Sequence, residues 1–328
     1  MRGSMMKGTI QTGFGDPDEV LRIGEVETPV VDDDGVLVRV RAASIHIGAV
    51  YGVRGLPKVM RPMFKSFIAK SGVIGQDIAG VVEATGQDVT QLAVGDEVFG
   101  SCKGAFAQYA STKSGALALK PTSFTFEQAS AIGVSAFTAL QGLRDHGNLE
   151  EGQKVLVTGA SGGVGTFAVQ IAKAMGAEVT GVCSTRNLDM VRSIGADHVI
   201  DYTREDFTKS EPRYNLILDN VGAHSLKDMR GALTSDGLLL ANGAPAPTGW
   251  FGGLGHPLKV AASSMLSKQQ GRPFLSTENE EDLATLRDLA ETGKITPVID
   301  QTFPLDNAIE AITSVGAGHN QGTTIITV

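Results

Sequence analysis

The stretch Lys154–Gly165, with the sequence KVLVTGASGGVG, decides the fold of this chain. Its first part, Lys154–Thr158, has the apolar pattern of a buried strand, and a helical pattern over Gly163–Met175 follows the glycine-rich turn. Small residues in the turn let the backbone approach a pyrophosphate, and the start of the helix offers unpaired N–H groups to it. The order of strand, glycine loop and helix therefore predicts a dinucleotide-binding Rossmann unit. The residues expected to contact the cofactor here are Ser161, Gly162, Gly163 and Val164.

Strands and helices alternate beyond this loop. The expected strands are Glu178–Cys183, His198–Asp201, Leu216–Asp219 and Leu238–Ala241, and a helix is expected over Asn187–Ile194. Short apolar strands that alternate with helices indicate βαβ units and a parallel sheet buried on both faces. A doubly wound α/β domain is therefore predicted over residues 121–265. Near its start, Phe126–His146 is rich in Ala and Leu and lacks proline, which predicts a helix.

The residues before this domain have a different pattern. Val36–Val40, Ile78–Ala84 and Gly95–Gly100 have the composition of short strands separated by glycine turns. Short strands at this spacing are typical of a β-barrel-like domain. The chain closes with a further strand pattern over Thr323–Val328. We therefore expect a β-rich domain over residues 7–120, which the C-terminal residues 266–328 rejoin.

The composition excludes several classes of protein. The 328 residues include 28 Lys and Arg against 36 Asp and Glu, for a net charge of −8, so no nucleic-acid partner is expected. The only cysteines, Cys102 and Cys183, exclude a disulfide framework and a cysteine-rich zinc lobe. Together with the lack of a signal leader, they favour a reducing cytoplasm. Leu56–Ser71 is basic and amphipathic, so contact with a membrane surface stays a minor alternative to a lid or a plain surface helix.

The second strand of the α/β domain, Glu178–Cys183, predicts which cofactor binds. An NAD enzyme usually places Asp or Glu at the end of this strand to bind the ribose 2′-hydroxyl. Here Ser184, Thr185 and Arg186 follow the strand, and no acid occurs until Asp189. A hydroxyl and a guanidinium suit a 2′-phosphate, so we expect NADPH, bound through Ser184 and Arg186. The alternative is that Arg186 only lies at the solvated start of a helix.

Eight segments of the chain carry a resemblance to a known family. They are Gly13–Leu21 (GFGDPDEVL), Val36–Ser44 (VLVRVRAAS), Val94–Phe99 (VGDEVF), Gly104–Tyr109 (GAFAQY), Gly159–Gly165 (GASGGVG), Ile194–Tyr202 (IGADHVIDY), Asp219–Gly222 (DNVG) and Lys294–Asp300 (KITPVID). Over nearly its whole length the chain resembles the medium-chain dehydrogenase/reductase superfamily, in its zinc-independent quinone oxidoreductase-like branch. The resemblance implies a GroES-like catalytic domain, a Rossmann domain, a cleft between the two and a homodimer.

The resemblance also bears on metal binding. Zinc alcohol dehydrogenases, which look similar overall, place Cys, His and Cys where this chain has His46, Gln76 and Val134. A catalytic zinc needs about three protein ligands, and one histidine does not supply them. No metal site is therefore expected.

The resemblance further implies which residues contact the nicotinamide and the substrate. Ser44–Gly55 would lie beside the nicotinamide, where His46 replaces a common Asn and Ala49 a common Asp, while Tyr51 keeps the spacing of a frequent Tyr. His46 and Tyr51 are the candidate proton donors. Their alternatives are a histidine satisfied by backbone groups and a tyrosine that packs in the cleft wall. The remaining cofactor contacts implied are Thr138, Tyr202, Asn220, Val221, Asn242, Gly243 and Ala244.

These observations predict an NADPH-dependent, metal-free reductase. Its acceptor would be a small molecule, either a quinone or an α,β-unsaturated ketone or aldehyde, and NADPH would supply the hydride. A zinc alcohol dehydrogenase is disfavoured by Gln76 and Val134. A zinc-independent alcohol dehydrogenase or carbonyl reductase, and a non-catalytic NADPH-binding sensor, stay open as alternatives.

Overall fold

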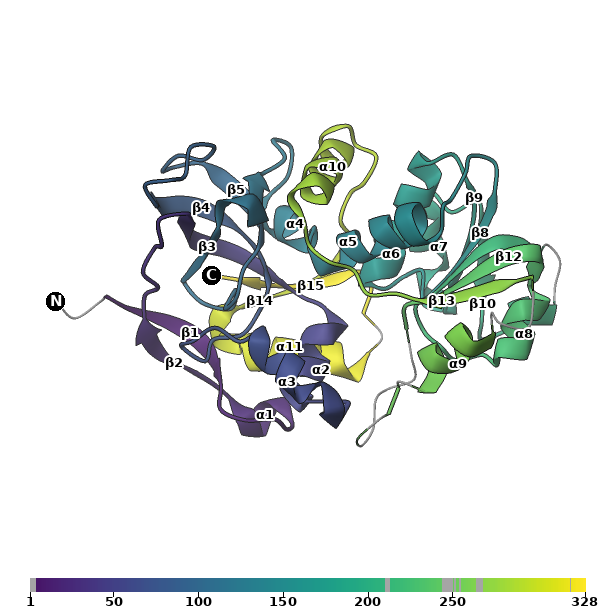
Figure 1. The fold of residues 1–328 in the computed structure, drawn as a ribbon, viewed down its shortest axis with the longest axis horizontal. Helices are drawn as coiled ribbons and strands as arrows, with labels where there is room; N and C mark the ends of the chain where they lie inside the picture. Colours follow the sequence, from purple (N-terminus) through teal and green to yellow (C-terminus); the bar gives the residue numbers. More distant parts are fainter. Residues whose placement is uncertain are drawn as a thin grey trace. The chain divides into compact units, whose positions relative to one another are not determined.

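The computed structural model of the chain describes residues 4–209, 213–243, 250, 252–253, 255–263, 268–318 and 320–328. It divides into two compact units. Unit 1 consists of Met1–Phe137, Glu278–Gly293 and Pro297–Val328, and unit 2 consists of Thr138–Thr277 and Lys294–Thr296. Each unit has its own sheet, and Figure 1 shows both.

Unit 1 is the β-rich unit. In the described part of the chain, its main sheet has the strand order β14-β15-β3-β4-β5-β7, with β6 paired to β3, while β1 and β2 form a separate hairpin. The strands are β1 (Met5–Gln11), β2 (Leu21–Glu27), β3 (Gly35–Ile45), β4 (Asp77–Thr85), β5 (Glu97–Ser101), β6 (Tyr109–Lys113), β7 (Leu117–Leu119), β14 (Ile299–Pro304) and β15 (Thr323–Thr327). The helices are α1 (Pro17–Val20), α2 (Ile47–Arg54), α3 (Arg61–Ser66), α4 (Phe126–Ala131), the first half of α5 (Val134–Gln141), α10 (Glu280–Glu291) and α11 (Ala308–Ala317).

The core of unit 1 follows from the alternation in β3. Val36, Val38 and Val40 are almost fully buried, while Arg39 and Arg41 between and beside them face solvent. Side chains alternate between the two faces of a strand, so the three valines lie on one face. They belong to a cluster that also includes Ile312 of α11, which explains why the C-terminal residues return to this unit.

Unit 2 is a parallel sheet with helices on both faces. Its strand order is β10-β9-β8-β11-β12-β13. The strands are β8 (Lys154–Thr158), β9 (Glu178–Cys183), β10 (His198–Asp201), β11 (Tyr214–Asp219), β12 (Leu233–Ala241) and β13 (Gln270–Pro273). Helices α6 (Gly163–Ala174) and α7 (Leu188–Ser193) lie along one face, and α8 (Leu226–Gly231) and α9 (Gly255–Ser263) along the other (Figure 1). The order reverses between β8 and β11, and ligands of such sheets bind at the carboxyl ends of the strands at this point.

These two sheets confirm the predicted fold class, an α/β chain with a GroES-like β-rich domain and a Rossmann domain. The ranges expected from the sequence, 7–120 with 266–328 and 121–265, differ from the two units. Residues 121–137 lie in unit 1 because α4 packs on β3 and β4, and residues 266–277 lie in unit 2 because β13 pairs with β12.

The helix expected over Phe126–His146 is interrupted. The chain forms α4, breaks at Ile132 and Gly133, and continues as α5 and a π-helical turn over Gly142–His146. A Cβ atom at Gly133 would lie 2.0 Å from Cγ of Asp77. The break therefore places the start of α5 against a buried carboxyl group of strand β4.

Candidate active site

The glycine-rich loop joins β8 to α6 in unit 2. Gly162 is the N-cap of α6, and Gly159 has a φ of +61°, which favours glycine. A Cβ atom at Gly165 would lie 2.1 Å from the Gly159 carbonyl oxygen, so only glycine lets the helix start this close to the end of the strand. The amide groups of the first turn of α6 thus lie at the carboxyl end of β8. This tight turn before a long helix fits the pyrophosphate of a dinucleotide.

A buried hydrogen bond links this loop to the next strand. The Asn187 side chain donates from Nδ2 to Oγ of Ser161 at 2.8 Å, and both residues are buried. Ser161 is an expected cofactor contact, whereas the sequence analysis did not single out Asn187. Its position, directly after Arg186, brings the segment after β9 against the glycine loop.

The residues expected at the 2′-phosphate gather at one end of β9 and β10. Ser184 follows β9 and begins the 3₁₀ turn Thr185–Asn187, in which Arg186 is exposed. Tyr202 follows β10, has an exposed fraction of 57%, and donates its backbone N–H to the Cys183 carbonyl oxygen at 3.1 Å. The three expected ligands therefore come from two neighbouring strand ends.

Asp201, the last residue of β10, is an acid that the sequence analysis missed at this end of the sheet. Its carboxylate accepts hydrogen bonds from the Thr185 hydroxyl at 2.5 Å and from Thr203, and Arg204 lies 3.5 Å away. The hydrogen bonds from Thr185 and Thr203 lower the pKa of this carboxyl group. The Asp201 carboxylate is thus bound by hydroxyl groups from the segments after both β9 and β10.

The loops after β8, β11 and β12 are tied together through Asp219 and Asn220. Asp219 accepts hydrogen bonds from the Thr158 hydroxyl at 2.7 Å and from two backbone amides of its own loop. Asn220 donates to the Thr158 carbonyl oxygen at 3.0 Å and accepts from Nδ2 of Asn242 at 2.7 Å. A Cβ atom at Gly243 would lie 2.1 Å from the Asn220 backbone, so these loops touch.

The remaining residues expected to contact the cofactor are Val221, Thr138 and Ala244, which lie in separate segments. Val221 is 45% exposed in the loop after β11. Thr138 is buried in α5 and shares a 2.8 Å hydrogen bond with Ser276. Ala244 lies outside the described residues.

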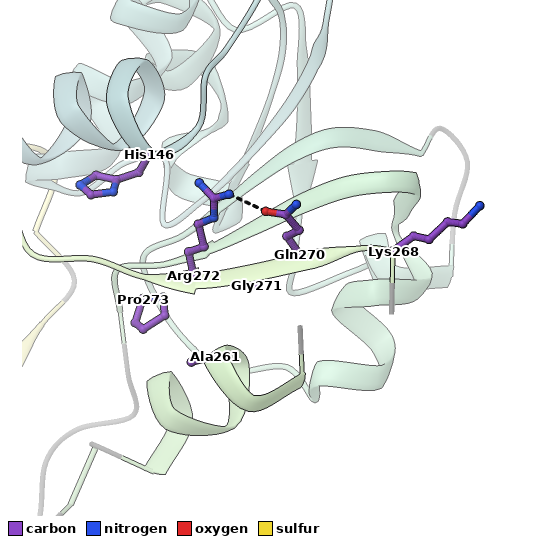
Figure 2. A pocket seen from close by; sticks show the side chains of 7 residues that line it. All are labelled: His146, Ala261, Lys268, Gln270, Gly271, Arg272 and Pro273. Carbon is purple, nitrogen blue, oxygen red and sulfur yellow. Dashed lines mark hydrogen bonds between the residues drawn. The ribbon is translucent and has the colours of Figure 1, made fainter. Parts of the chain in front are cut away.

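Unit 2 also contains a hollow. It is lined by residues of β13 and its neighbours, among them His146, Lys268 and Arg272. Figure 2 shows Arg272 and Gln270 pointing toward one another, joined by a 2.5 Å hydrogen bond, while Lys268 extends away from them. None of the expected site residues lines this hollow.

His46 connects β3 to α2 in unit 1. The ring is half-buried, and its Nε2 lies 3.0 Å from Oε1 of Gln76. Because a carboxamide oxygen only accepts, Nε2 carries the proton, and Nδ1 of the neutral ring is then an acceptor. Burial lowers the pKa of His46, while the Gln76 hydrogen bond and the Glu278 charge oppose this effect. The printed hydrogen-bond partner of the ring is thus a side chain and not a backbone group.

Tyr51 lies on the second turn of α2. His46 is the N-cap of this helix, five positions before Tyr51. Burial raises the pKa of the half-buried Tyr51 hydroxyl, an effect that Arg54 partly offsets. Tyr51 is therefore neutral at physiological pH and able to donate a hydrogen bond.

A buried carboxyl group, which the sequence analysis did not single out, lies next to the His46 site. Asp77 is 1% exposed, accepts from the Ser44 hydroxyl at 3.0 Å, and accepts from the Val134 amide at 3.2 and 3.3 Å. Burial raises its pKa to about 7, although the hydrogen bonds from Val134 and Ser44 act in the opposite direction. The local sequence pattern does not single out Asp77, because its burial follows from the tertiary fold.

At the three positions where alcohol dehydrogenases hold zinc ligands, this chain has His46, Gln76 and Val134. His46 and Gln76 are hydrogen-bonded to each other, and Val134 contributes only its backbone amide to Asp77. Among the described residues, no three His, Cys, Asp or Glu side chains are grouped to hold a metal ion.

The comparisons with known proteins agree with this geometry. Residues 32–122 match the family described as alcohol dehydrogenase GroES-like domain, and residues 194–326 match the family described as zinc-binding dehydrogenase. The mitochondrial NAD(P)H oxidoreductase RTN4IP1 of Mus musculus is 32% identical, with 100% of this chain and 90% of that protein covered. The 2-methylene-furan-3-one reductase of Solanum lycopersicum is 30% identical, over 98% of this chain and 79% of that protein. The structure of the quinone oxidoreductase from Coxiella burnetii has a TM-score of 0.84 at 25% identity, over 99% and 100% of the two chains.

The fold, the glycine loop and these likenesses define an oxidoreductase that uses a nicotinamide cofactor. The substrate of such an enzyme is a small molecule. The chain belongs to the medium-chain dehydrogenase/reductase superfamily, in its zinc-independent quinone oxidoreductase-like branch.

The expectation of a cytoplasmic protein is wrong. The related mouse oxidoreductase is a mitochondrial protein by its name. The expectation rested on composition and on two unpaired cysteines, and these properties indicate only a compartment that keeps thiols reduced. In the described part of the chain, no helix is long and apolar enough to cross a membrane.

The raised pKa of Asp77 predicts a pH-dependent stability. The pKa of Asp77 is near 3.8 in the unfolded chain and about 7 in the folded chain. The proton on Asp77 therefore stabilises the folded state fully below about pH 4, and this stabilisation is lost as the pH rises through about 7. Asp77→Asn removes this titration. We expect the wild type to lose a few kcal/mol relative to the variant over this range, at about 1.4 kcal/mol for each unit of pKa shift.

Urea unfolding of both proteins at a series of pH values from about 4 to about 8 measures this difference. A difference in free energy of unfolding that stays constant over the series would contradict a proton held by buried Asp77.

Proposed function

We propose that the protein is an NADPH-dependent, zinc-independent reductase of quinones or of α,β-unsaturated ketones and aldehydes. The observation that carries the proposal is the glycine loop of β8 and α6 with Ser184, Arg186 and Tyr202 at the neighbouring strand ends. NADPH, when bound, supplies a hydride from C4 of its nicotinamide. The residues of the chain bind the cofactor, exclude water and stabilise the charge that develops on the acceptor oxygen.

The preference for NADPH rests on the charges at the ends of β9 and β10. No acidic side chain directly follows β9, where a ribose 2′-hydroxyl would need one. Arg186 offers a guanidinium for charge-assisted hydrogen bonds to a 2′-phosphate, and Ser184 and Tyr202 offer hydroxyl groups. Asp201, which would repel a phosphate, is bound by Thr185 and Thr203 and lies 3.5 Å from Arg204.

The acceptor is proposed from the chemistry of unit 1 and from the named relatives. One relative is a reductase of an enone, and the solved structure is a quinone oxidoreductase. Both acceptors develop negative charge on oxygen once a hydride arrives, and this charge requires a hydrogen-bond donor or a proton. His46 and Tyr51 are the candidates for this role in this chain. A homodimer is proposed on the family resemblance alone.

Turnover with two acceptors tests the proposed function. Chelator-treated protein should oxidise NADPH when either a simple quinone or a 2-alkenal is added, because neither hydride transfer nor protonation uses a metal here. The fall in absorbance of NADPH measures the rate, and the preferred acceptor identifies the substrate class. Binding of NADPH without turnover of either acceptor would contradict the reductase and favour a non-catalytic NADPH-binding protein.

Replacement of Arg186 tests the cofactor. Arg186→Ala should raise KM for NADPH by about 10-fold or more, as expected for loss of a charged hydrogen bond, and should leave KM for NADH little changed. Arg192→Ala in α7 is the matched control, since this exposed arginine lies 3.0 Å from Asp189 and outside the loop. Equal effects of Arg186→Ala on both cofactors would rule out a contact with the 2′-phosphate.

A further inference from the structure

The turn that carries Arg186 is anchored to the neighbouring strand on one side. Thr185, the residue before Arg186, donates its hydroxyl to the Asp201 carboxylate at 2.5 Å. Asp201 is the last residue of β10 and the register partner of Cys183, the last residue of β9, so the bond joins two adjacent strand ends. Asp201 is buried, and a hydrogen bond to an ionised group is stronger than one between neutral groups. The start of the turn is therefore fixed to β10.

A second hydrogen bond anchors the turn on the other side of Arg186. Asn187, the residue after Arg186, is buried and donates to Oγ of Ser161 in the glycine loop at 2.8 Å. The backbone closes the turn as well, since the Asn187 amide donates to the Ser184 carbonyl oxygen at 2.9 Å. The backbone at Arg186 is thus fixed from both sides before any cofactor binds.

The hydrogen bonds of Asp201 also determine which hydroxyl groups are available to a phosphate. The carboxylate accepts from the Thr185 hydroxyl and, at 2.7 Å, from the Thr203 hydroxyl. A hydroxyl has one hydrogen to donate, and in both threonines Asp201 receives it. The Ser184 side chain, in contrast, makes no capping hydrogen bond to the turn. Ser184 and Arg186 are therefore better suited than Thr185 to donate to a 2′-phosphate.

Asp201 acts on a 2′-phosphate in two opposite ways. Its negative charge repels the phosphate, whereas its hydrogen bond to Thr185 holds the turn that carries Arg186. The repulsion is weakened, because the carboxylate also accepts from the Thr203 amide at 3.0 Å and lies 3.5 Å from the Arg204 guanidinium. Holding the turn lowers the entropic cost of binding, because the segment is ordered in advance. The geometry therefore favours the positioning role over the repulsion.

We propose that Asp201 determines the preference for NADPH over NADH, because it holds Thr185 and thereby Arg186 at the end of β9. This inference rests on the proposed NADPH preference and assigns a residue that produces it. An acid at the end of β9 would bind the ribose 2′-hydroxyl of NAD. The acid of this chain lies one strand further along, where the protein itself occupies its oxygens. Asp201 acts through Thr185 and is a positioning residue.

Binding of two nucleotides tests this role without turnover. Adenosine 2′,5′-bisphosphate carries the 2′-phosphate and 5′-AMP lacks it, and calorimetric titration of the whole protein gives both dissociation constants. Thr185→Val removes the hydroxyl and keeps the charge of Asp201 and nearly the same shape. We expect it to weaken binding of the bisphosphate by about 5-fold, since the turn must then be ordered on binding, and to leave binding of 5′-AMP unchanged. No change for the bisphosphate, or an equal change for both nucleotides, would overturn the proposal.

Thr208→Val is the matched control for this substitution. Thr208 donates its hydroxyl to the Asp206 carboxylate at 2.6 Å, as Thr203 does to Asp201, and both pairs are two residues apart. It lies in the turn Phe207–Lys209, away from the residues expected to contact the cofactor in the sequence. Thr208→Val should therefore change neither dissociation constant.

Asp201→Asn separates the two effects of the acid. Asparagine lacks the charge and offers one acceptor oxygen to the hydroxyl groups of both Thr185 and Thr203. We expect binding of the bisphosphate to weaken by about 5-fold or more, and KM for NADPH to rise by a similar factor with little change in KM for NADH. Tighter binding of the bisphosphate would show that repulsion is the larger effect and would overturn the proposal.

The same titrations distinguish this inference from the cofactor assignment. Tighter binding of the bisphosphate than of 5′-AMP by the wild type, with loss of the difference in Arg186→Ala, would support the NADPH preference independently of Asp201. An unchanged preference in Thr185→Val would then overturn the role of Asp201 alone. Equal binding of both nucleotides by the wild type would contradict the NADPH preference and this inference together.

Discussion

The packing around the candidate site in unit 1 depends on the hydrogen bonds that the buried Asp77 carboxyl group accepts. A buried carboxyl without partners is costly, and here Ser44 and the Val134 amide supply the hydrogen bonds. The amide is available because the chain breaks at Gly133, where a side chain would collide with the carboxyl. The same contacts fix the ends of β3 and β4, from which His46 and Gln76 extend to meet at 3.0 Å. The candidate proton donor is therefore oriented by packing that begins at Asp77.

Unit 2 uses an acid at a strand end in a comparable way. Asp219 accepts hydrogen bonds from the Thr158 hydroxyl and from two backbone amides of its own loop, so the loops after β8 and β11 hold each other in place. Asn220 extends this contact to Asn242 after β12. In a parallel sheet all carboxyl ends lie on one edge, and these bonds shape that edge for a cofactor before it binds. Such preorganisation lowers the entropic cost of binding.

Much of the fold could be predicted because its signals are local. The strand and helix around the glycine loop, and the strands up to Leu238–Ala241, follow from apolar patterns and glycine turns within short windows. The contacts that define the site depend on tertiary structure. Glu278 lies about 200 residues from Asp77 in the sequence, and no pattern in either segment indicates that the charge of Asp77 raises the pKa of Glu278. In the sequence, Gln76 is notable only because it stands where zinc alcohol dehydrogenases have a metal ligand. Its hydrogen bond to His46 could not be predicted, because it depends on the register of two strands.

The interruption between α4 and α5 is another feature that depends on tertiary structure and could not be predicted from the local sequence. Phe126–His146 has the composition of a helix, and Gly133 alone does not predict a break, because glycine inside a helix costs only about 1 kcal/mol. The break is imposed by a carboxyl group on a strand 56 positions earlier. A motif within one short segment, such as the loop Ser161–Val164, can thus be recognised in the sequence, whereas a contact between two distant segments cannot.

The most direct test of a hydride-transferring reductase is the fate of an isotopic label. The protein would be supplied with a 2-alkenal and with NADPH deuterated at C4 on one face or the other, in ordinary water, and the product analysed by mass spectrometry and NMR. The proposed reaction places one deuterium on the β-carbon of the product from only one of the two labelled cofactors, and a solvent hydrogen on the α-carbon. A reduced product without deuterium from either cofactor would contradict direct hydride transfer in this protein.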